Sequence, residues 1–113
     1  MKFTHRITWN IGLNRGAVPY PAAEAIEAAS EQLARRGIDG FTILQGVGYW
    51  QGSPEACLVV SVMLDGDNPP PAWSMENHAA AYAIAADLAQ ILGQDAVAWS
   101  IDPLTAGGLA FAS

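Results

Sequence analysis

The stretch that decides the fold is residues 41–64, FTILQGVGYWQGSPEACLVVSVML. It holds two runs rich in β-branched and aromatic residues, 41–50 and 57–64, separated by the turn segment QGSPE. Runs of this kind on either side of a short turn predict an antiparallel hairpin. Gly46 and Gly48 inside the first run indicate a bulge or a close backbone approach, because glycine weakens a plain strand.

Upstream of the hairpin the sequence predicts a strand followed by a helix. Residues 3–13 alternate between apolar and polar side chains, which is the period-two pattern of a half-buried strand. Pro21 is tolerated in a first helical turn. The apolar residues of 22–33 recur at helical spacing, and Gly37 is a typical stop after a helix. We therefore expect a helix that starts near Pro21 and ends before Gly37.

Downstream of the hairpin, a proline-rich loop leads into a second helix and a last strand. Residues 65–71 are polar and end in consecutive prolines, which favour a stiff extended segment. Ser74 is a candidate N-cap for a helix that runs to about Leu92 and stops at Gly93. Residues 96–101 alternate again and predict the final strand.

The element order β-α-β-β-α-β predicts an α+β fold of the ferredoxin-like kind, an antiparallel sheet with both helices on one face. We expect the helix side of the sheet to carry Phe3, Ile7, Trp9, Leu44, Leu58, Val60, Val62, Val97 and Trp99. The other face is then bare, and we expect it to carry Arg6, Thr8, Asn10, Ile43, Gln45, Val47, Tyr49, Val59, Ser61, Met63 and Ser100. Such a mixture of polar and apolar residues favours a subunit interface or a ligand floor.

Composition predicts a single domain, residues 1–113, that assembles with copies of itself. A chain of 113 residues can fold as one domain without disulfides or metals. Charged residues make up only 14% of the sequence, against about 25% in a typical soluble domain. The weakly polar surface that results is expected to be covered in a homodimer or a higher homo-oligomer. The small, apolar segment 102–113 is expected either to cross a partner subunit or to fray.

Charge and cysteine usage argue against several classes of protein. Five basic residues against eleven acidic ones give a net charge of −6, and the scattered bases form no patch for a nucleic-acid polymer. No stretch approaches the roughly 18 apolar residues of a membrane span, and the N-terminus lacks the apolar core of a signal peptide. We therefore expect a cytoplasmic protein without a membrane partner. The single cysteine, Cys57, is expected to be a buried, structural thiol in a reducing compartment.

The sequence predicts neither a metal site nor a cofactor. His5 and His78 are the only histidines, and they lie on different elements without cysteine or acidic partners at ligand spacing. Asp65 and Asp67 resemble the start of a calcium loop, but the prolines that follow break that pattern. No cluster of acid, base and nucleophile is visible, which favours a binding protein over an enzyme.

The candidate ligand-binding residues come from a loop and from the hairpin end. The segment GLNRG at 12–16 follows a strand and precedes a helix, where glycine-rich phosphate loops occur. It matches neither the Walker nor the dinucleotide fingerprint, so a generic loop is the alternative to phosphate or ribose contacts by Asn14 and Arg15. Tyr49 and Trp50 adjoin glycines, and they are expected either to stack on a purine or to pack in a subunit interface.

Three short motifs carry a resemblance to a known family. They are IGLN at 11–14, GFTI at 40–43, and the string GxGYWxGxxE at 46–55 that leads into LVV at 58–60. Together they resemble the phage anti-Thoeris sponge proteins, over residues 7–64. Those small cytoplasmic proteins sequester cyclic ADP-ribose isomers made by bacterial immune systems and do not cleave them. The resemblance implies a ligand enclosed at a subunit interface, with an aromatic side chain on the base and arginine or asparagine on phosphate and ribose.

We therefore expect a non-enzymatic protein that sequesters a cyclic nucleotide immune signal in a homo-oligomer. Tight capture needs complementarity only to the ground state of the ligand. The residues expected to contact the nucleotide are Arg6, Asn10, Asn14, Arg15, Tyr49 and Trp50. One alternative is an enzyme of the dimeric α/β-barrel kind with His5 or Tyr49 in proton transfer. The other is a structural oligomer without a ligand, and the sequence leaves a phage or bacterial origin open.

Overall fold

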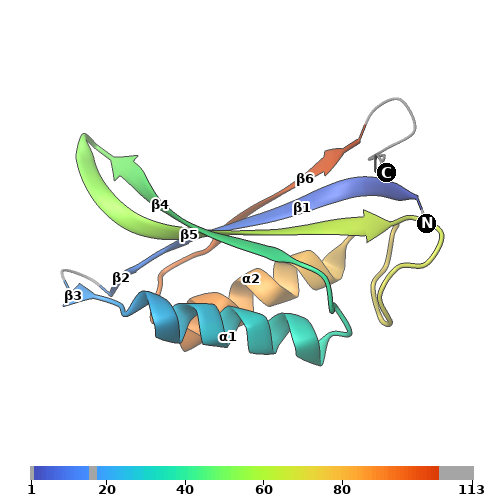
Figure 1. The fold of residues 1–113 in the computed structure, drawn as a ribbon, viewed down its shortest axis with the longest axis horizontal. Coiled ribbons are helices and arrows are strands. Elements are labelled where there is room, and N and C mark those ends of the chain that lie inside the picture. The colour runs from blue at the N-terminus through green and yellow to red at the C-terminus, as the bar shows by residue number, and fades with distance from the viewer. Residues whose placement is uncertain (1, 16–17, 105–113) are drawn as a thin grey trace, which may run out of the picture.

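The computed structural model of the chain describes residues 2–15 and 18–104. The elements are β1 (Phe3–Gly12), β2 (Asn14–Arg15), β3 (Val18–Pro19), α1 (Ala22–Arg35), β4 (Thr42–Trp50), β5 (Ser53–Asp65), α2 (Ala79–Ile91) and β6 (Ala98–Pro103). Four of the strands form an antiparallel sheet in the order β4-β5-β1-β6. Both helices cover one face of this sheet and leave the opposite face bare (Figure 1). The predicted ferredoxin-like α+β fold is confirmed.

The core lies between the sheet and the two helices, with Trp9 at its centre. Trp9 is fully buried, as are its neighbours Ile7 and Ile11 in β1. The indole Nε1–H of Trp9 donates a hydrogen bond to the backbone oxygen of Ala81 at 3.0 Å, which ties β1 to α2. Alternate residues of β5, from Leu58 onward, face the same core. The period-two pattern of both central strands was therefore a sound guide to the buried side.

Helix α1 matches its prediction closely. Its apolar face buries Ala25, Ala29 and Leu33, and Pro21 occupies the position before the first helical residue. Gly37 follows the helix with φ at +75°, a left-handed conformation that glycine adopts without steric penalty. The predicted helix end is therefore confirmed.

Helix α2 begins later than predicted, at Ala79, and Ser74 is not its N-cap. The backbone N–H of His78 donates to the carbonyl oxygen of Ser74 at 2.9 Å, so residues 74–78 form a separate turn. His78 itself takes the N-cap position with φ at +51°. The far end agrees with the sequence, since Gly93 follows the helix with φ at +64°.

The β4–β5 hairpin is longer and more regular than the sequence predicts. Its turn consists of Gln51 and Gly52, with φ at +51° and +81°, which is the backbone that a tight two-residue hairpin turn requires. Strand β5 therefore starts at Ser53 instead of residue 57. The ladder runs without a shift from Thr42 opposite Ser61 to Trp50 opposite Ser53. The bulge considered for the glycines of β4 is therefore absent.

The side chains of β4 lie on the faces opposite to those predicted. Ile43 is paired with the buried Val60 and so lies on the helix side of the sheet. Leu44 is paired with Val59 and is 61% exposed on the bare face. A one-residue change of register moves every side chain of a strand to the other face. Residues of 43–49 that were assigned to the bare face, Ile43, Gln45, Val47 and Tyr49, therefore belong to the helix-side register.

Two smaller features lie outside the main hairpin and the helices, namely the β2–β3 pair and the end of β6. Strands β2 and β3 form a short hairpin in the segment that was expected to be an irregular loop. Asp102 and Pro103, the first residues of the segment 102–113, belong to β6, and residues 105–113 lie outside the described residues. Within the described ranges, no helix is long and apolar enough to cross a membrane.

Candidate functional site

The bare face carries a flat patch of small residues near the hairpin end of the sheet, which we call the glycine floor. It consists of Gly12 of β1, Gly46 and Gly48 of β4, and Cys57 of β5 between them. Cys57 is paired with both Gly12 and Gly46. A Cβ atom added at Gly46 would lie 3.5 Å from the Cys57 Sγ atom, and one at Gly48 would lie 3.9 Å from it. At Gly46 and Gly48 the missing side chains leave backbone that a flat ligand can approach closely.

Cys57 is therefore not the buried core residue that the sequence predicted. It is half-buried on the bare face, while the next residue, Leu58, is fully buried on the helix side. The run of apolar residues at 57–60 resembles a strand that is covered on both faces. In the structure only alternate residues of this run reach the core, because helices cover one face of the sheet.

Glu55 places a carboxylate at the edge of the glycine floor. Its Oε1 atom lies 2.5 Å from the position that a Cβ atom would take at Gly12, and Gln94 Oε1 lies 3.6 Å from the same position. The Gln94 side chain is held in place because its Nε2 donates to the carbonyl oxygen of Asn14 at 2.6 Å. A carboxylate and a carboxamide thus converge on a residue that has no side chain of its own.

Sequence reasoning missed the roles of Glu55 and Gln94. In the sequence, Glu55 is only the last residue of the hairpin motif. Gln94 lies in the connection from α2 to β6, and no local sequence pattern distinguishes it. The spacing of Gly12, Gly46 and Gly48 was the available signal. It becomes informative only with the strand pairing, which places the three glycines in the same-face register of β1 and β4, the two strands that flank β5.

The predicted ligand-binding residues do not form one cluster. Arg6 and Asn10 are both exposed in β1. Asn10 is paired with Val59 and lies beside the floor, whereas Arg6 is paired with Met63 nearer the other end of the sheet. Six residues of strand separate Arg6 from Gly12, roughly 20 Å. Arg6 therefore lies toward the opposite end of the bare face from the floor, and its part in ligand binding stays a prediction.

The remaining predicted residues lie around the hairpin end. Asn14 is half-buried in β2, and its carbonyl oxygen is already engaged by Gln94. Tyr49 is 73% exposed, but its register places it on the face opposite the floor. The backbones of Arg15 and Trp50 are described as parts of β2 and β4, and their side chains lie outside the description. Their part in ligand binding stays a prediction.

His5 and His78 meet in space, which the sequence did not predict. Their ring centroids are 5.4 Å apart, and the indole N–H of Trp73 donates to Nδ1 of His78 at 3.0 Å. Desolvation, and then the nearby His5, hold the pKa of His78 below its ordinary value. Among the described residues no group of three or more histidine, cysteine or acidic side chains is suited to a metal. His5 lies near the start of β1, roughly 20 Å along the strand from Gly12 of the floor.

A concave region lies at the same end of the sheet as His5 and His78. It is a pocket of about 600 Å³ between the α1–β4 connection, the end of β5 and the proline-rich loop. Of the predicted ligand-binding residues whose side chains are described, none lines it. The described part of the chain therefore offers a flat floor at one end of the sheet and a walled pocket at the other.

The comparisons with known proteins bear on the fold. No protein-family model and no curated protein matches the sequence. The chain is similar in structure to a phage SAM lyase in its apo state, with a TM-score of 0.65 and 19% identity, covering 89% of this chain and 81% of that one. It is also similar to a phage SAM lyase in complex with S-methyl-5′-thioadenosine, with a TM-score of 0.63 and 19% identity over 91% and 83% of the two chains.

A third similar structure is a DUF3240 family protein from Shewanella baltica. Its TM-score is 0.56 at 14% identity, and the match covers 96% of this chain and 98% of that one. At such identities the similarity establishes a shared fold and no more. The class defined by these observations is a ferredoxin-like α+β domain with an uncovered sheet face.

Proposed function

We propose that the protein binds a small adenosine-containing nucleotide on the glycine floor, enclosed between copies of the chain. The observation that carries the proposal is the floor itself, which exposes backbone of neighbouring strands next to Asn10 and Glu55. A purine can lie against the backbone of Gly46 and Gly48, beside the Cys57 side chain and next to the Glu55 carboxylate over Gly12. The Glu55 carboxylate accepts hydrogen bonds from ribose hydroxyls, and the Asn10 amide both donates and accepts them.

The character of the whole bare face supports an assembly. Thr8, Val59 and Met63 are half-buried, and Leu44 is mostly exposed. The four strands, taken at about 4.8 Å spacing and about nine residues of 3.3 Å, give a footprint of roughly 600 Å². That is of the same order as the ~800 Å² that each partner buries in a standard interface. A second copy of the chain would turn the flat floor into an enclosed site.

Within this proposal we favour sequestration of a cyclic ADP-ribose-type immune signal over turnover. The motifs within residues 7–64 support this choice, and they include Gly12, Gly46 and Gly48 of the floor. Among the described residues, the titratable side chains at the floor are Glu55 and Cys57, and the histidine pair lies far away. Capture requires complementarity to the ligand, whereas turnover also requires groups placed for a transition state. Trp50 is the residue proposed to stack on the base, with Arg15 and Asn14 near the phosphates.

A second candidate function is catalysis on S-adenosylmethionine. The shared fold with a phage SAM lyase, one structure of which holds S-methyl-5′-thioadenosine, favours this alternative. Both candidate ligands contain adenosine, so the floor would serve either one. In this second reading the Glu55 carboxylate would attract the positive sulfonium group of the substrate.

One experiment separates the two candidates. The purified protein is titrated by calorimetry with cyclic ADP-ribose isomers and with S-adenosylmethionine, and the small molecules are then recovered by denaturation and identified by mass spectrometry. Sequestration predicts tight binding and recovery of an unchanged cyclic nucleotide. Lyase activity predicts release of S-methyl-5′-thioadenosine that is lost in Glu55→Gln and kept in the control Glu76→Gln, an exposed residue away from the floor. Failure of wild type to bind either ligand at high micromolar concentration overturns the proposal.

A further inference from the structure

The pocket lies where β5 extends beyond the start of β4. Strand β4 begins at Thr42, which is paired with Ser61, while β5 continues to Asp65. The last residues of β5 therefore have no β4 partner along this edge. The pocket of about 600 Å³ occupies the space beside them, and this volume is within the range typical of sites for small molecules.

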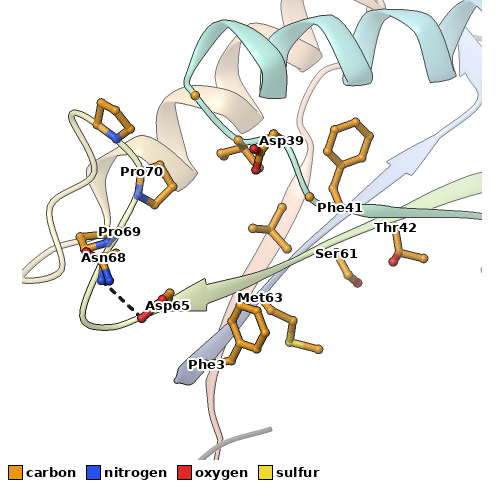
Figure 2. A pocket seen from close by; sticks show the side chains of 15 residues that line it. Phe3, Asp39, Phe41, Thr42, Ser61, Met63, Asp65, Asn68, Pro69 and Pro70 are labelled. Carbon is orange, nitrogen blue, oxygen red and sulfur yellow. Dashed lines mark hydrogen bonds between the residues drawn. The ribbon is translucent and has the colours of Figure 1, made fainter. Parts of the chain in front are cut away.

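Three segments wall the pocket, as Figure 2 shows. Asp39 and Phe41 come from the connection between α1 and β4, and Met63 comes from the sheet. The third wall is the loop that contains Pro69 and Pro70. Prolines have a fixed φ and no backbone N–H, so this wall is stiff and largely apolar. The pocket thus combines a hydrophobic lining with an opening to solvent.

The charges that line the pocket are all negative. Among the residues that the structure describes, Asp39 and Asp65 line it, and no lysine, arginine or histidine does. The backbone N–H groups of Asp67 and Asn68 donate to Asp65 Oδ1 at 2.9 and 3.3 Å. The bond from Asp67 is the main cause that lowers the pKa of Asp65, although desolvation opposes it. Asp65 is therefore ionised at neutral pH.

We propose that this pocket binds a small organic ammonium ion, a cation that also carries apolar groups. The carboxylates of Asp39 and Asp65 supply charge complementarity, while Phe41 and the proline-rich loop supply aromatic and apolar surface for the cation and its carbon groups. Anionic ligands are disfavoured here because the lining is acidic. The aromatic and proline side chains of the walls offer no ligand atoms to a bare metal ion.

The pocket and the glycine floor are separate sites. Cys57 and Met63 are six residues apart on β5, which corresponds to roughly 20 Å of strand. Binding of an ammonium ion in the pocket therefore does not depend on the proposed nucleotide function, and variants of each site leave the other intact.

The test uses choline and its uncharged carbon analogue, 3,3-dimethylbutan-1-ol, which have the same shape apart from the nitrogen. Each is titrated into ¹⁵N-labelled protein at low ionic strength, and the backbone amide shifts are followed. We expect saturable shifts of the backbone amides of Thr42 and Met63. Choline should bind about two- to fivefold more tightly than the alcohol. Raising the salt concentration should weaken choline binding and leave the alcohol unaffected.

Matched variants assign the effect to the pocket. Asp39→Asn and Asp65→Asn should each weaken choline binding by about two- to fivefold, and asparagine at 65 keeps an oxygen for the turn to Asp67. The control Asp102→Asn removes one carboxylate from β6, outside the pocket, and should change nothing. Three results would each overturn the proposal: no saturable shift with choline, equal affinity for the alcohol, or equal weakening by Asp102→Asn.

Discussion

The two ends of β5 offer opposite kinds of surface. At the hairpin end, Gly12, Gly46 and Gly48 flank Cys57 and leave a floor that has the Glu55 carboxylate at one edge and no loops around it. At the other end, loops from outside the sheet surround a pocket within one copy of the chain. A ligand on the floor therefore needs a second copy to enclose it, whereas a ligand in the pocket does not. Dependence on assembly is thus what separates the two sites.

The largest expected effect comes from placing a charge in the middle of the bare face. Thr8 is half-buried there, between Ser61 and Ser100, and Thr8→Arg would bury an unpaired charge in the interface at a cost of about 3–5 kcal/mol. Light scattering should show a monomer, and nucleotide binding should be lost while choline binding remains. The control Glu27→Arg, on the exposed side of α1, should change neither. A wild-type monomer at micromolar concentration would contradict the assembly itself.

A slightly smaller effect is expected from filling the floor. Gly46→Val adds a side chain where a Cβ atom would already be 3.5 Å from Cys57 Sγ. Nucleotide affinity should fall by about 1–3 kcal/mol, the range for overpacking a close contact. Stability should be kept or raised, because valine favours a strand and glycine weakens one. Calorimetric titration and thermal unfolding of the same sample measure both, and unchanged affinity in a folded variant would remove the floor from the site.

The two hairpin aromatics, Tyr49 and Trp50, test which face of the hairpin binds the nucleotide. If Trp50 stacks on the base, Trp50→Ala should weaken nucleotide binding by about 1–3 kcal/mol, or roughly five- to 150-fold in Kd. Tyr49→Ala is the matched control, since Tyr49 lies on the face opposite the floor and its removal should have little effect. Arg15→Ala should weaken a phosphate-bearing nucleotide and spare adenosine. A larger loss of nucleotide affinity in Tyr49→Ala than in Trp50→Ala would place the nucleotide on the helix side of the hairpin instead of on the glycine floor.

The smallest effect concerns pH at the pocket end of the sheet. Burial, and then His5, lower the pKa of His78 in the folded protein, so folding favours the neutral ring. Its contribution to stability is present above the ordinary histidine pKa of about 6.5 and is lost as pH falls below that value. His78→Asn should flatten this loss, and asparagine tolerates the positive φ at this position. Denaturant midpoints between about pH 5 and about pH 8 measure it.

His5→Gln is the companion variant for this measurement. It removes the lesser cause of the lowered His78 pKa and leaves desolvation in place, so it should flatten the pH dependence only in part. Identical pH profiles for wild type and His78→Asn would show that this histidine does not limit stability in acid.

Local signals in the sequence predicted the elements that obey a single strong rule. The alternation in residues 3–13 identified the core side of β1, including Trp9, and Gly37 and Gly93 identified the helix ends. Strand β4 was harder, because it has apolar residues in both registers and glycines in one of them. The two faces of such a strand look alike until the pairing with β5 fixes the register.

The candidate site was less predictable than the fold because it depends on contacts between distant segments. Gln94 and Asn14 are 80 residues apart and are joined by a hydrogen bond. The turn before α2 is another case, since Trp73 and His78 are held together by a side-chain hydrogen bond and Ser74 does not cap the helix. Neither contact produces a periodic pattern in the sequence.

The central claim is that the glycine floor holds a nucleotide between copies of the chain, and native mass spectrometry with cyclic ADP-ribose isomers tests it most directly. Wild type and Gly46→Val are compared at equal concentration, with choline as a ligand that needs no assembly. We expect nucleotide bound only to species with two or more chains, and little or none bound to Gly46→Val. Nucleotide bound to single chains, or bound equally by both proteins, would contradict it.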